Sequence, residues 1–166
     1  ANKTYDATTA ATVQTRTLAG VIGLDDVSLI GGTASFNNAN AGTGITVTLT
    51  GATLTGTAVS NYSLTTVNTT TANIAKATAI LTVTGYNVVY DGAAHQATAT
   101  ATGVVGEDLS AGVNLSGTMH TNVGTGVYID SVTYTDTTGN YNNATKLVTD
   151  RISKANVTMT VTGYNA

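Results

Sequence analysis

The residues of this sequence that could do chemistry are two histidines, a few carboxylates and the tyrosines. His95 and His120 lie 25 positions apart, and neither has a second His or Cys at metal-ligand spacing. A zinc site needs about three or four such ligands, so we interpret both as solvated turn histidines and predict no zinc. A Ser-His-Asp set can be drawn from Ser110, His95 and Asp91, but no nucleophile-elbow pattern accompanies it. We therefore predict no catalytic residues and no enzyme.

Two acidic pairs come closest to an ion site. Asp25 and Asp26 form one pair, and Glu107 and Asp108 form the other. Calcium takes about six to eight oxygen ligands, and neither pair lies in an EF-hand-like or nonapeptide ligand run. The four residues remain weak calcium candidates, and the simpler interpretation is that these carboxylates cap backbone N–H groups at turns. No cofactor is predicted.

The tyrosines are the other candidate binding residues. Eight tyrosines accompany one Phe and no Trp, which could indicate a sugar-binding platform. Four of them, however, occur at recurring positions of the internal repeat described below: Tyr5, Tyr62, Tyr90 and Tyr141. Recurrence favours a packing role for these rings.

The composition predicts strands and turns and excludes several partners. Charged residues make up 9% of the chain, against about 25% in an ordinary globular protein, while Thr, Val, Gly and Asn are abundant. A net charge of −3 with six Lys and Arg provides no basic patch for nucleic acid or an anionic membrane. No apolar run is long enough to span a bilayer, and we expect any export signal or anchor outside residues 1–166. Cysteine is absent, so disulfides cannot contribute stability.

An internal repeat organises the chain. Residues 72–87 return in large part as residues 150–165, with Lys76 and Lys154 separated by 78 positions. A fixed period of this kind indicates a tandem array of modules. We expect one module at 1–77, a second at 78–155, and the opening strand of a third at 156–166. Only residues 75–79 connect the first two, so the joint should be stiff.

Further landmarks recur in the same order in both modules, with offsets that fall from 85 to 78. The alternation at Ile45, Val47 and Leu49 predicts a strand with one buried face, preceded by a hairpin turn in N-x-G-T-G. The predicted core of the second module consists of Leu81, Val83, Val127, Ile129, Val132, Tyr141 and Ile152. Residues 25–29 and 107–110 could each form one helical turn. We predict an all-β fold of two immunoglobulin-like β-sandwich modules, with β-grasp-like modules as the alternative if residues 25–29 form a helix.

The ordered motifs carry a family resemblance. With K-x-Y-D, G-V-x-G-x-D-D, N-x-G-T-G, N-Y and I-x-K-A in that order, residues 1–77 resemble a YDG-type repeat. Residues 78–155, with T-V-T-G-Y-N-x-x-Y-D-G, G-E-D-L and G-N-Y-N, resemble the related MBG-type repeat. Both families occur in bacterial surface adhesins, including filamentous haemagglutinin-like proteins. Ala7 stands where glycine usually follows Tyr-Asp, and Ala disfavours the left-handed turn that glycine permits.

The resemblance implies a structural repeat of an extracellular adhesin or fibre at the bacterial cell surface. The alternative is an adhesive module that binds a host or matrix glycan or protein. An enzyme has no support in the sequence. A pocket present in only one module would favour binding, whereas equivalent featureless surfaces in both would favour a spacer.

The two modules differ at their starts. The second is opened by residues 80–84, whereas the first has no such strand after Ala1, and the missing pattern stands at Thr158, Met159, Thr160, Val161 and Thr162. A sheet that lacks a strand exposes an edge that invites a strand from elsewhere. We therefore hypothesise that residues 157–163 of one copy complete the first module of the next, through the covalent chain or between separate chains, head to tail.

Overall fold

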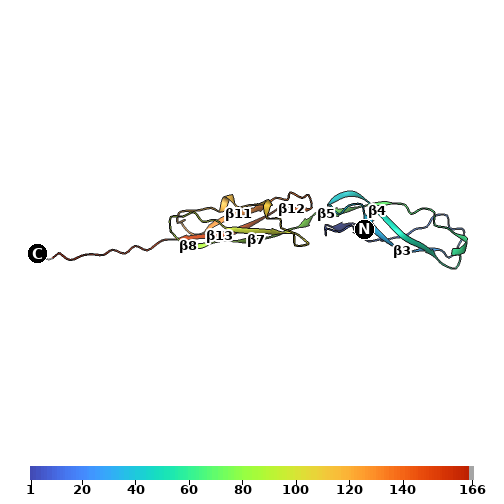
Figure 1. Cartoon of the computed structure of the whole chain (residues 1–166), viewed down its shortest axis with the longest axis horizontal. Helices are drawn as coiled ribbons and strands as arrows, with labels where there is room; N and C mark the ends of the chain where they lie inside the picture. Colours follow the sequence, from blue (N-terminus) through green and yellow to red (C-terminus); the bar gives the residue numbers. More distant parts are fainter. Residues whose placement is uncertain (165–166) are drawn as a thin grey trace. The chain divides into compact units, whose positions relative to one another are not determined.

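The computed structural model describes residues 1–164, and Figure 1 shows its ribbon. The chain divides into two compact units. Unit 1 comprises Ala1–Thr78 together with Thr138–Asn142, and unit 2 comprises Ala79–Thr137 together with the residues from Asn143 onward. The described residues form strands and a few single 3₁₀ turns, so the predicted all-β fold is confirmed.

Unit 1 is built on one five-stranded sheet. Its strands are β1 (Lys3–Thr4), β2 (Ala10–Ala11), β3 (Ser28–Phe36), β4 (Gly42–Thr55) and β5 (Thr70–Ala75). They lie in the order β1-β5-β4-β3-β2. β1 runs parallel to β5, and all other neighbours are antiparallel.

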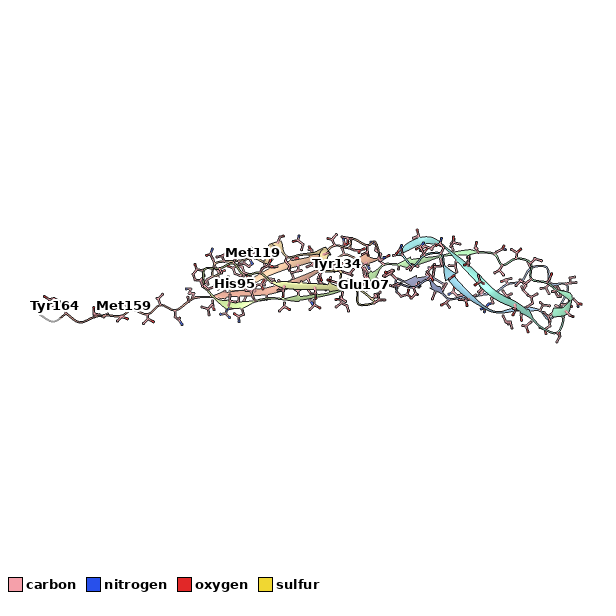
Figure 2. The ribbon with its side chains drawn as sticks, viewed as in Figure 1. His95, Glu107, Met119, Tyr134, Met159 and Tyr164 are labelled. Carbon is pink, nitrogen blue, oxygen red and sulfur yellow. The ribbon has the colours of Figure 1, made fainter. Side chains whose placement is uncertain are left out.

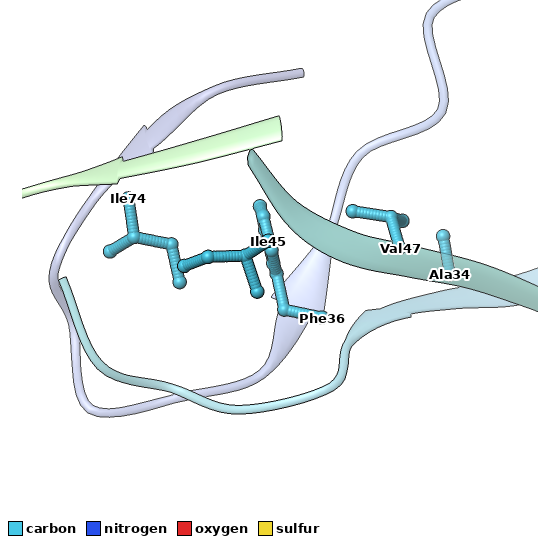
Figure 3. Packing of buried hydrophobic residues seen from close by; sticks show 5 residues of the cluster. All are labelled: Ala34, Phe36, Ile45, Val47 and Ile74. Carbon is cyan, nitrogen blue, oxygen red and sulfur yellow. The ribbon is translucent and has the colours of Figure 1, made fainter. Parts of the chain in front are cut away.

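The core of unit 1 gathers on one face of the β3–β4 hairpin. Ile45 and Val47 alternate with more exposed threonines along β4, as predicted, because successive side chains of a strand point to opposite faces. They are buried with Ala34 and Phe36 of β3 and with Ile74 of β5 (Figure 3). The β3–β4 hairpin forms as predicted, but its turn covers residues 37–41. Only Asn40 and Ala41 of the N-x-G-T-G motif lie in the turn, and Gly42–Gly44 already belong to β4.

A short segment from the second sequence repeat belongs to unit 1. β12 (Tyr141–Asn142) pairs in parallel with β6 (Ala77–Thr78). Tyr141 is buried, and its ring meets the Tyr5 ring edge to face with 5.5 Å between centroids. Tyr141 was predicted in the core of the second module, and that assignment is wrong because its ring packs in unit 1.

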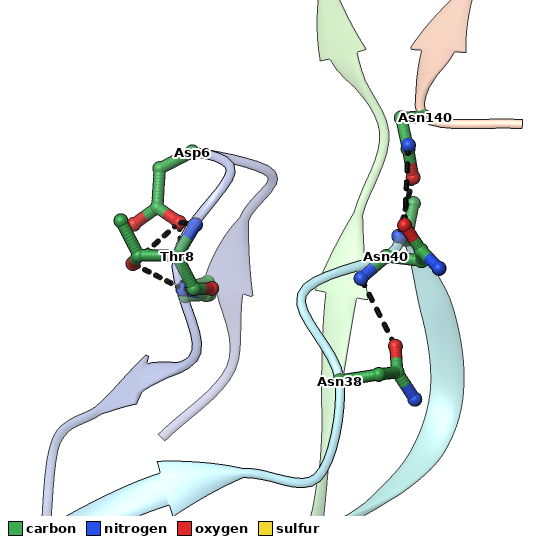
Figure 4. A network of polar contacts seen from close by, with 7 residues as sticks. Asp6, Thr8, Asn38, Asn40 and Asn140 are labelled. Carbon is green, nitrogen blue, oxygen red and sulfur yellow. Dashed lines mark hydrogen bonds and ion pairs between the residues drawn. The ribbon is translucent and has the colours of Figure 1, made fainter. Parts of the chain in front are cut away.

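Asn140 fixes the same segment by three hydrogen bonds. Its Oδ1 accepts from the N–H of Ala41 at 2.9 Å, and its Nδ2 donates to Asn40 Oδ1 at 3.4 Å (Figure 4). Its carbonyl oxygen accepts from the N–H of Ala77 at 2.9 Å. Asn140 is largely buried, and these bonds satisfy its amide and carbonyl groups.

Unit 2 consists of two sheets that pack face to face. The larger has the order β10-β11-β13-β8, with β8 (Asn87–Val89), β10 (Val113–Asn114), β11 (Tyr128–Tyr134) and β13 (Ala144–Ser153). The smaller is the antiparallel pair of β7 (Ile80–Thr84) and β9 (Thr98–Thr102). Val83 of β7 and Ala99 of β9 pack on Val132 and Val148 of the larger sheet, which makes unit 2 a small β-sandwich.

The predicted core of the second module is right in part. The buried or half-buried members are Leu81, Val83, Val132 and Ile152. Val127 and Ile129 are 50% and 67% exposed, so their assignment to the core is wrong.

The error comes from a one-residue slip between the repeats. Ile45 lies opposite Ala72 of β5, and Asp150, the residue 78 positions after Ala72, lies opposite Tyr128 rather than Val127. The N-x-G-T-G motif directly precedes Ile45 in the first repeat and Val127 in the second, so the motif alone would align Ile45 with Val127. A β-bulge immediately before Ile45 in unit 1 accounts for the different spacing. Because side chains alternate along a strand, a slip of one residue exchanges the buried and exposed faces.

Residues 25–29 form no helical turn, whereas a 3₁₀ turn begins at Ser110, the last residue of the segment 107–110. Residues 25–27 are irregular, and the Asp26 carboxylate accepts from the N–H of Thr57 across the loop, at 3.0 Å, instead of capping its own turn. The β-grasp alternative, which required a helix at 25–29, is therefore wrong for unit 1. The 3₁₀ turns of the described residues are η1 (Val59–Asn61), η2 (Ser110–Gly112) and η3 (Ser116–Thr118). Within residues 1–164, no helix is long and apolar enough to span a membrane.

Ala7 adopts the left-handed conformation that its side chain disfavours, with φ of +62°. The turn is held by Asp6, whose Oδ1 accepts from the N–H of Thr8 at 2.9 Å and from Lys3 Nζ at 2.7 Å (Figure 4). The hydrogen bond from Lys3 is the main reason that the pKa of Asp6 falls to about 2. Gly92 has the matching conformation in unit 2, with φ of +80°.

Candidate strand-acceptor site

The closing strands of the two units have the same pairing, which makes their positions equivalent. The matching pairs are Lys3 with Ile74, Thr4 with Ala75, Val88 with Ile152 and Val89 with Ser153. Beyond them, the N–H groups of Tyr5 and Tyr90 donate to the carbonyl oxygens of Ala75 and Ser153, each at 2.8 Å. Positions of β5 therefore correspond to positions of β13 that lie 78 residues later.

The opening strand of unit 2 is part of its core. β7 pairs with β9, with Leu81 opposite Ala101 and Val83 opposite Ala99. Ala79 is buried, Leu81 and Val83 are half-buried, and the residues between them are exposed. The inward face of this strand thus consists of every second residue from Ala79 onward.

Gly85 and Tyr86 anchor the end of this strand on β13. A Cβ at Gly85 would lie 2.2 Å from the carbonyl oxygen of Thr149, so only glycine fits. The N–H of Tyr86 donates to Asp150 Oδ1 at 2.9 Å. The carbonyl oxygen of Tyr86 accepts from the N–H of Arg151 at 2.8 Å.

The C-terminal segment repeats this opening strand without its contacts. Residues 157–164 correspond to residues 79–86, and the predicted inter-module strand Thr158 to Thr162 lies within them. They form no strand in the described part of the chain, and the exposed fractions are 96% for Val157, 84% for Met159, 77% for Val161 and 91% for Tyr164. Figure 2 shows Met159 and Tyr164 on a segment that runs away from the strands of unit 2. A Cβ at Gly163 would meet no atom within 4 Å, in contrast to Gly85.

Unit 1 contains a cavity of about 1000 Å³. Its walls are two irregular segments, residues 12–19 and 62–68, together with side chains of β3, β4 and β5. Apolar side chains that line it include Val13, Leu18, Leu29, Leu49, Leu54 and Leu64.

This cavity occupies the place that the opening strand holds in unit 2. Residues 12–19 stand at the sequence position of β9, the partner of that strand, and within residues 1–164 no strand pairs with them. The walls also include Thr71 and Ala72, the equivalents of Thr149 and Asp150, on which Gly85 and Tyr86 rest. Among the described residues, no strand of unit 1 occupies the position that β7 holds in unit 2.

In unit 1, the side chain of Asn2 accepts a backbone hydrogen bond that the opening segment accepts in unit 2. Asn73 is the equivalent of Arg151, whose N–H bonds to the Tyr86 carbonyl in unit 2. In unit 1 the N–H of Asn73 donates to the side-chain Oδ1 of Asn2 at 2.8 Å. A backbone donor that unit 2 satisfies with its opening segment is thus satisfied here by an exposed side chain.

The two histidines are not the solvated turn residues that the sequence suggested. Their backbones form an antiparallel bridge, with N–H to carbonyl distances of 2.9 and 3.0 Å. The His120 ring stacks on Tyr128 with 3.7 Å between centroids, and its Nε2 lies 2.8 Å from Asp130 Oδ2. His95 Nε2 lies 3.0 Å from Asp91 Oδ1. Both side chains are about four-fifths covered. The one-residue slip brings Tyr128 and Asp130 inward beside His120, and the His95 ring lies 5.7 Å from the Tyr86 ring, centroid to centroid.

Asp150 is fully buried beside this cluster. Its Oδ1 accepts from the N–H of Tyr86, and Oδ2 faces no donor among the described residues. Burial is the main cause that raises the pKa of Asp150, and the neighbouring Asp130 carboxyl raises it further. A protonated Asp150 can donate to Asp130, which gives the buried oxygen a partner.

The carboxylates of the calcium candidates accept hydrogen bonds from other groups of the protein. Asp25 Oδ2 accepts from the Tyr62 hydroxyl at 2.7 Å. Glu107 Oε2 accepts from the N–H of Val105 at 3.0 Å, and Asp108 Oδ1 accepts from the N–H of Ser110 at 2.9 Å. Within residues 1–164, no three His, Cys, Asp or Glu side chains are grouped to hold a metal ion. Ser110 does not meet His95: its Oγ accepts from the N–H of Ala101 at 3.2 Å.

The sequence did not identify the walls of the cavity. Residues 12–19 lack the strict alternation of β9, and residues 62–68 carry no landmark beyond Asn61-Tyr62. The available signal was the equivalence of residues 12–19 with the partner of an opening strand that the first repeat lacks.

The fold and this site define an all-β protein built from two small units, one of them with an open strand position. The family model of the YDG domain matches residues 1–72, which confirms the YDG-type repeat expected there. The MBG-type resemblance of residues 78–155 lies outside that match and stays a prediction. No curated protein and no solved structure that was compared with the chain matches it.

Proposed function

We propose that this chain is a structural repeat unit of an extracellular bacterial adhesin or fibre, in which successive copies join head to tail by strand completion. One observation carries the proposal: residues 157–164 repeat a strand that is paired in unit 2, stand exposed, and match the open position of unit 1. The partner is therefore a neighbouring copy of the same repeat. The YDG match and the low content of charged residues support a place in a surface protein.

A stalk needs stiff repeats as well as joined ones. Unit 1 ends at Thr78 and unit 2 begins at Ala79, so no linker residue separates them. The chain also passes between the units on both sides of Thr138–Asn142. The short joint expected at residues 75–79 is the feature of the sequence that supports the role of a stiff spacer.

The test is a two-copy chain in which residue 166 is followed directly by residue 1. Residues 157–164 of the first copy then precede the second unit 1, with residues 165, 166 and 1 between Tyr164 and Asn2, the position equivalent to Asn87. We expect hydrogen exchange to show slow amides at residues 12–19 of the second copy and fast ones in the first. Equal exchange in both copies would contradict strand completion.

A matched pair of variants makes this test specific. In the first copy, Val161→Asp places a carboxylate on the inward face of the strand, whereas Thr160→Asp places it on the outward face, as the exposed equivalent Thr82 shows. Val161→Asp should abolish the added protection because a buried, unpaired carboxylate is unfavourable. Thr160→Asp should retain it.

A further inference from the structure

We propose that the cavity of unit 1 also takes residues 157–164 from a separate copy of the chain, so that copies assemble without a covalent link. This inference rests on the proposed function, since it uses the same strand and the same site. It adds that the strand comes from a separate chain, and it names the residues of unit 1 that the strand would contact. The occupant is a second copy because its free segment has the sequence pattern of the strand that fills this position in unit 2.

The contacts of Val161 in the cavity can be inferred from those of its equivalent in unit 2, Val83. In unit 2, Val83 packs against Val132 and Val148. The pairing of β4 and β11 places Leu49 at the position of Val132, and Thr70 corresponds to Val148. Leu49 and Thr70 both line the cavity, so Val161 would pack between them.

The end of the strand would seat on β5. Gly163 takes the place of Gly85, which allows its backbone to approach the carbonyl oxygen of Thr71 as closely as Gly85 approaches that of Thr149. This explains a glycine at 163, where nothing in the described part of its own chain requires one. The carbonyl of Tyr164 would then replace Asn2 Oδ1 as the acceptor for Asn73.

The surroundings of the tyrosine at the end of the opening strand are more polar in unit 2 than at the equivalent place in unit 1. Tyr86 lies near the carboxyl groups of Asp130 and Asp150, which both raise its pKa after burial itself. The equivalent positions in unit 1 are Val47 and Ala72, which line the cavity. The ring of Tyr164 would thus face Val47 and Ala72 instead of two carboxyl groups, and residues 157–164 carry no charge. Assembly should therefore depend little on salt.

The experiment mixes two full-length variants, each with one end blocked. Val161→Asp blocks the strand, and Leu18→Asp blocks the cavity, in which Leu18 is a half-buried wall residue. Thr70→Lys is a second cavity variant at an exposed position, in case Leu18→Asp fails to fold. Circular dichroism checks that each variant keeps its strands, and Ile30→Asp, at an exposed position outside the cavity, is the control.

Sedimentation should show unmodified chains and the Ile30→Asp control as concentration-dependent oligomers, and each blocked variant alone as a monomer. A strand-blocked chain mixed with a cavity-blocked chain should give a 1:1 dimer and nothing larger, at low and high salt. Monomers only in the mixture, or dimers of the strand-blocked variant alone, would overturn this inference. If the two-copy chain still shows a protected unit 1, the proposed function survives that failure.

Discussion

The ring of Tyr141 meets the ring of Tyr5 edge to face, 5.5 Å between centroids and 77° between planes, inside unit 1. Tyr5 comes from the first sequence repeat and Tyr141 from the second, 136 positions later. The boundary of the folded unit therefore does not coincide with the boundary of the sequence repeat. Residues 138–142 belong to the second sequence repeat but are part of unit 1.

Tyr141→Ala should destabilise unit 1 rather than unit 2. Removing a buried aromatic ring costs about 3 kcal/mol or more, which is a large fraction of the stability of so small a unit. Hydrogen exchange should report faster amides in β1, β5 and β6. Tyr90→Ala, at a 42% exposed ring, is the matched control and should change little. Faster exchange confined to unit 2 would contradict the placement of Tyr141.

Ile129 and Val132 provide a matched pair on β11. Val132 is fully buried and Ile129 is 67% exposed. Val132→Asp should unfold unit 2, because an unpaired buried carboxylate costs several kcal/mol, on the order of the stability of the unit. Ile129→Asp should leave thermal melting within about 0.5 kcal/mol of the unmodified chain, as for most surface substitutions. Equal melting of the two variants would contradict the register of β11.

The register of β11 also shows which parts of the fold could be predicted from the sequence and which could not. Alternation identified β4 and its buried Ile45 and Val47, because period-two patterning is local information. The same landmarks placed Ile129 inward, because a β-bulge changes the spacing by one residue and leaves no unambiguous mark in a Gly- and Thr-rich turn. The seat of Tyr141 could not be predicted, since it depends on long-range pairing of β12 with β6.

The candidate site was predictable at one end only. The strand pattern in residues 157–163 is visible as a repeat, and so is its absence from the first module. The cavity that would receive it is not visible, because its walls come from irregular segments that only the folded sheet brings together. The cover over His120 was missed for the same reason as the register of β11, because Tyr128 and Asp130 face inward beside it.

Ala7→Gly should stabilise unit 1. Ala7 holds a φ of +62°, which an L side chain occupies at a cost of roughly 1 kcal/mol and glycine occupies freely. Part of the gain is offset because glycine adds freedom to the unfolded chain. Chemical denaturation should show a net gain below about 1 kcal/mol. Ala58→Gly, at a residue with φ of −97°, should instead lower stability. A loss for Ala7→Gly would show that the turn is not strained.

Asp150 should make unit 2 more stable in acid than at neutral pH. Its raised pKa means that the folded chain binds this proton more tightly than the unfolded chain. The stabilisation is therefore fully present below the ordinary pKa of 3.8 and is lost as the pH rises through the raised value. The groups that face it are Tyr86, His120 and Asp130.

Asp150→Asn isolates this effect. The amide keeps an acceptor for the N–H of Tyr86, adds a donor toward Asp130, and does not titrate. Its melting temperature should exceed that of the unmodified chain by more at about pH 7 than at about pH 4. Two parallel melting curves across this range would show that Asp150 is not protonated in the folded unit.

The most direct measurement is the position of Val161 relative to residues 12–19 of a neighbouring unit 1. The chain has no cysteine, so Val161→Cys in the first copy of the two-copy chain can be paired with one cysteine in the second, at residue 14, 15 or 16. These three span the equivalents of Ala99, the partner of Val83. Opposite residues of antiparallel strands lie about 5 Å apart at Cα, within disulfide range. We expect one of the three pairs to form a disulfide rapidly, and we expect Leu24→Cys, at a fully exposed position, not to do so. If cysteines at residues 14–16 form the disulfide no faster than a cysteine at residue 24, strand completion is contradicted.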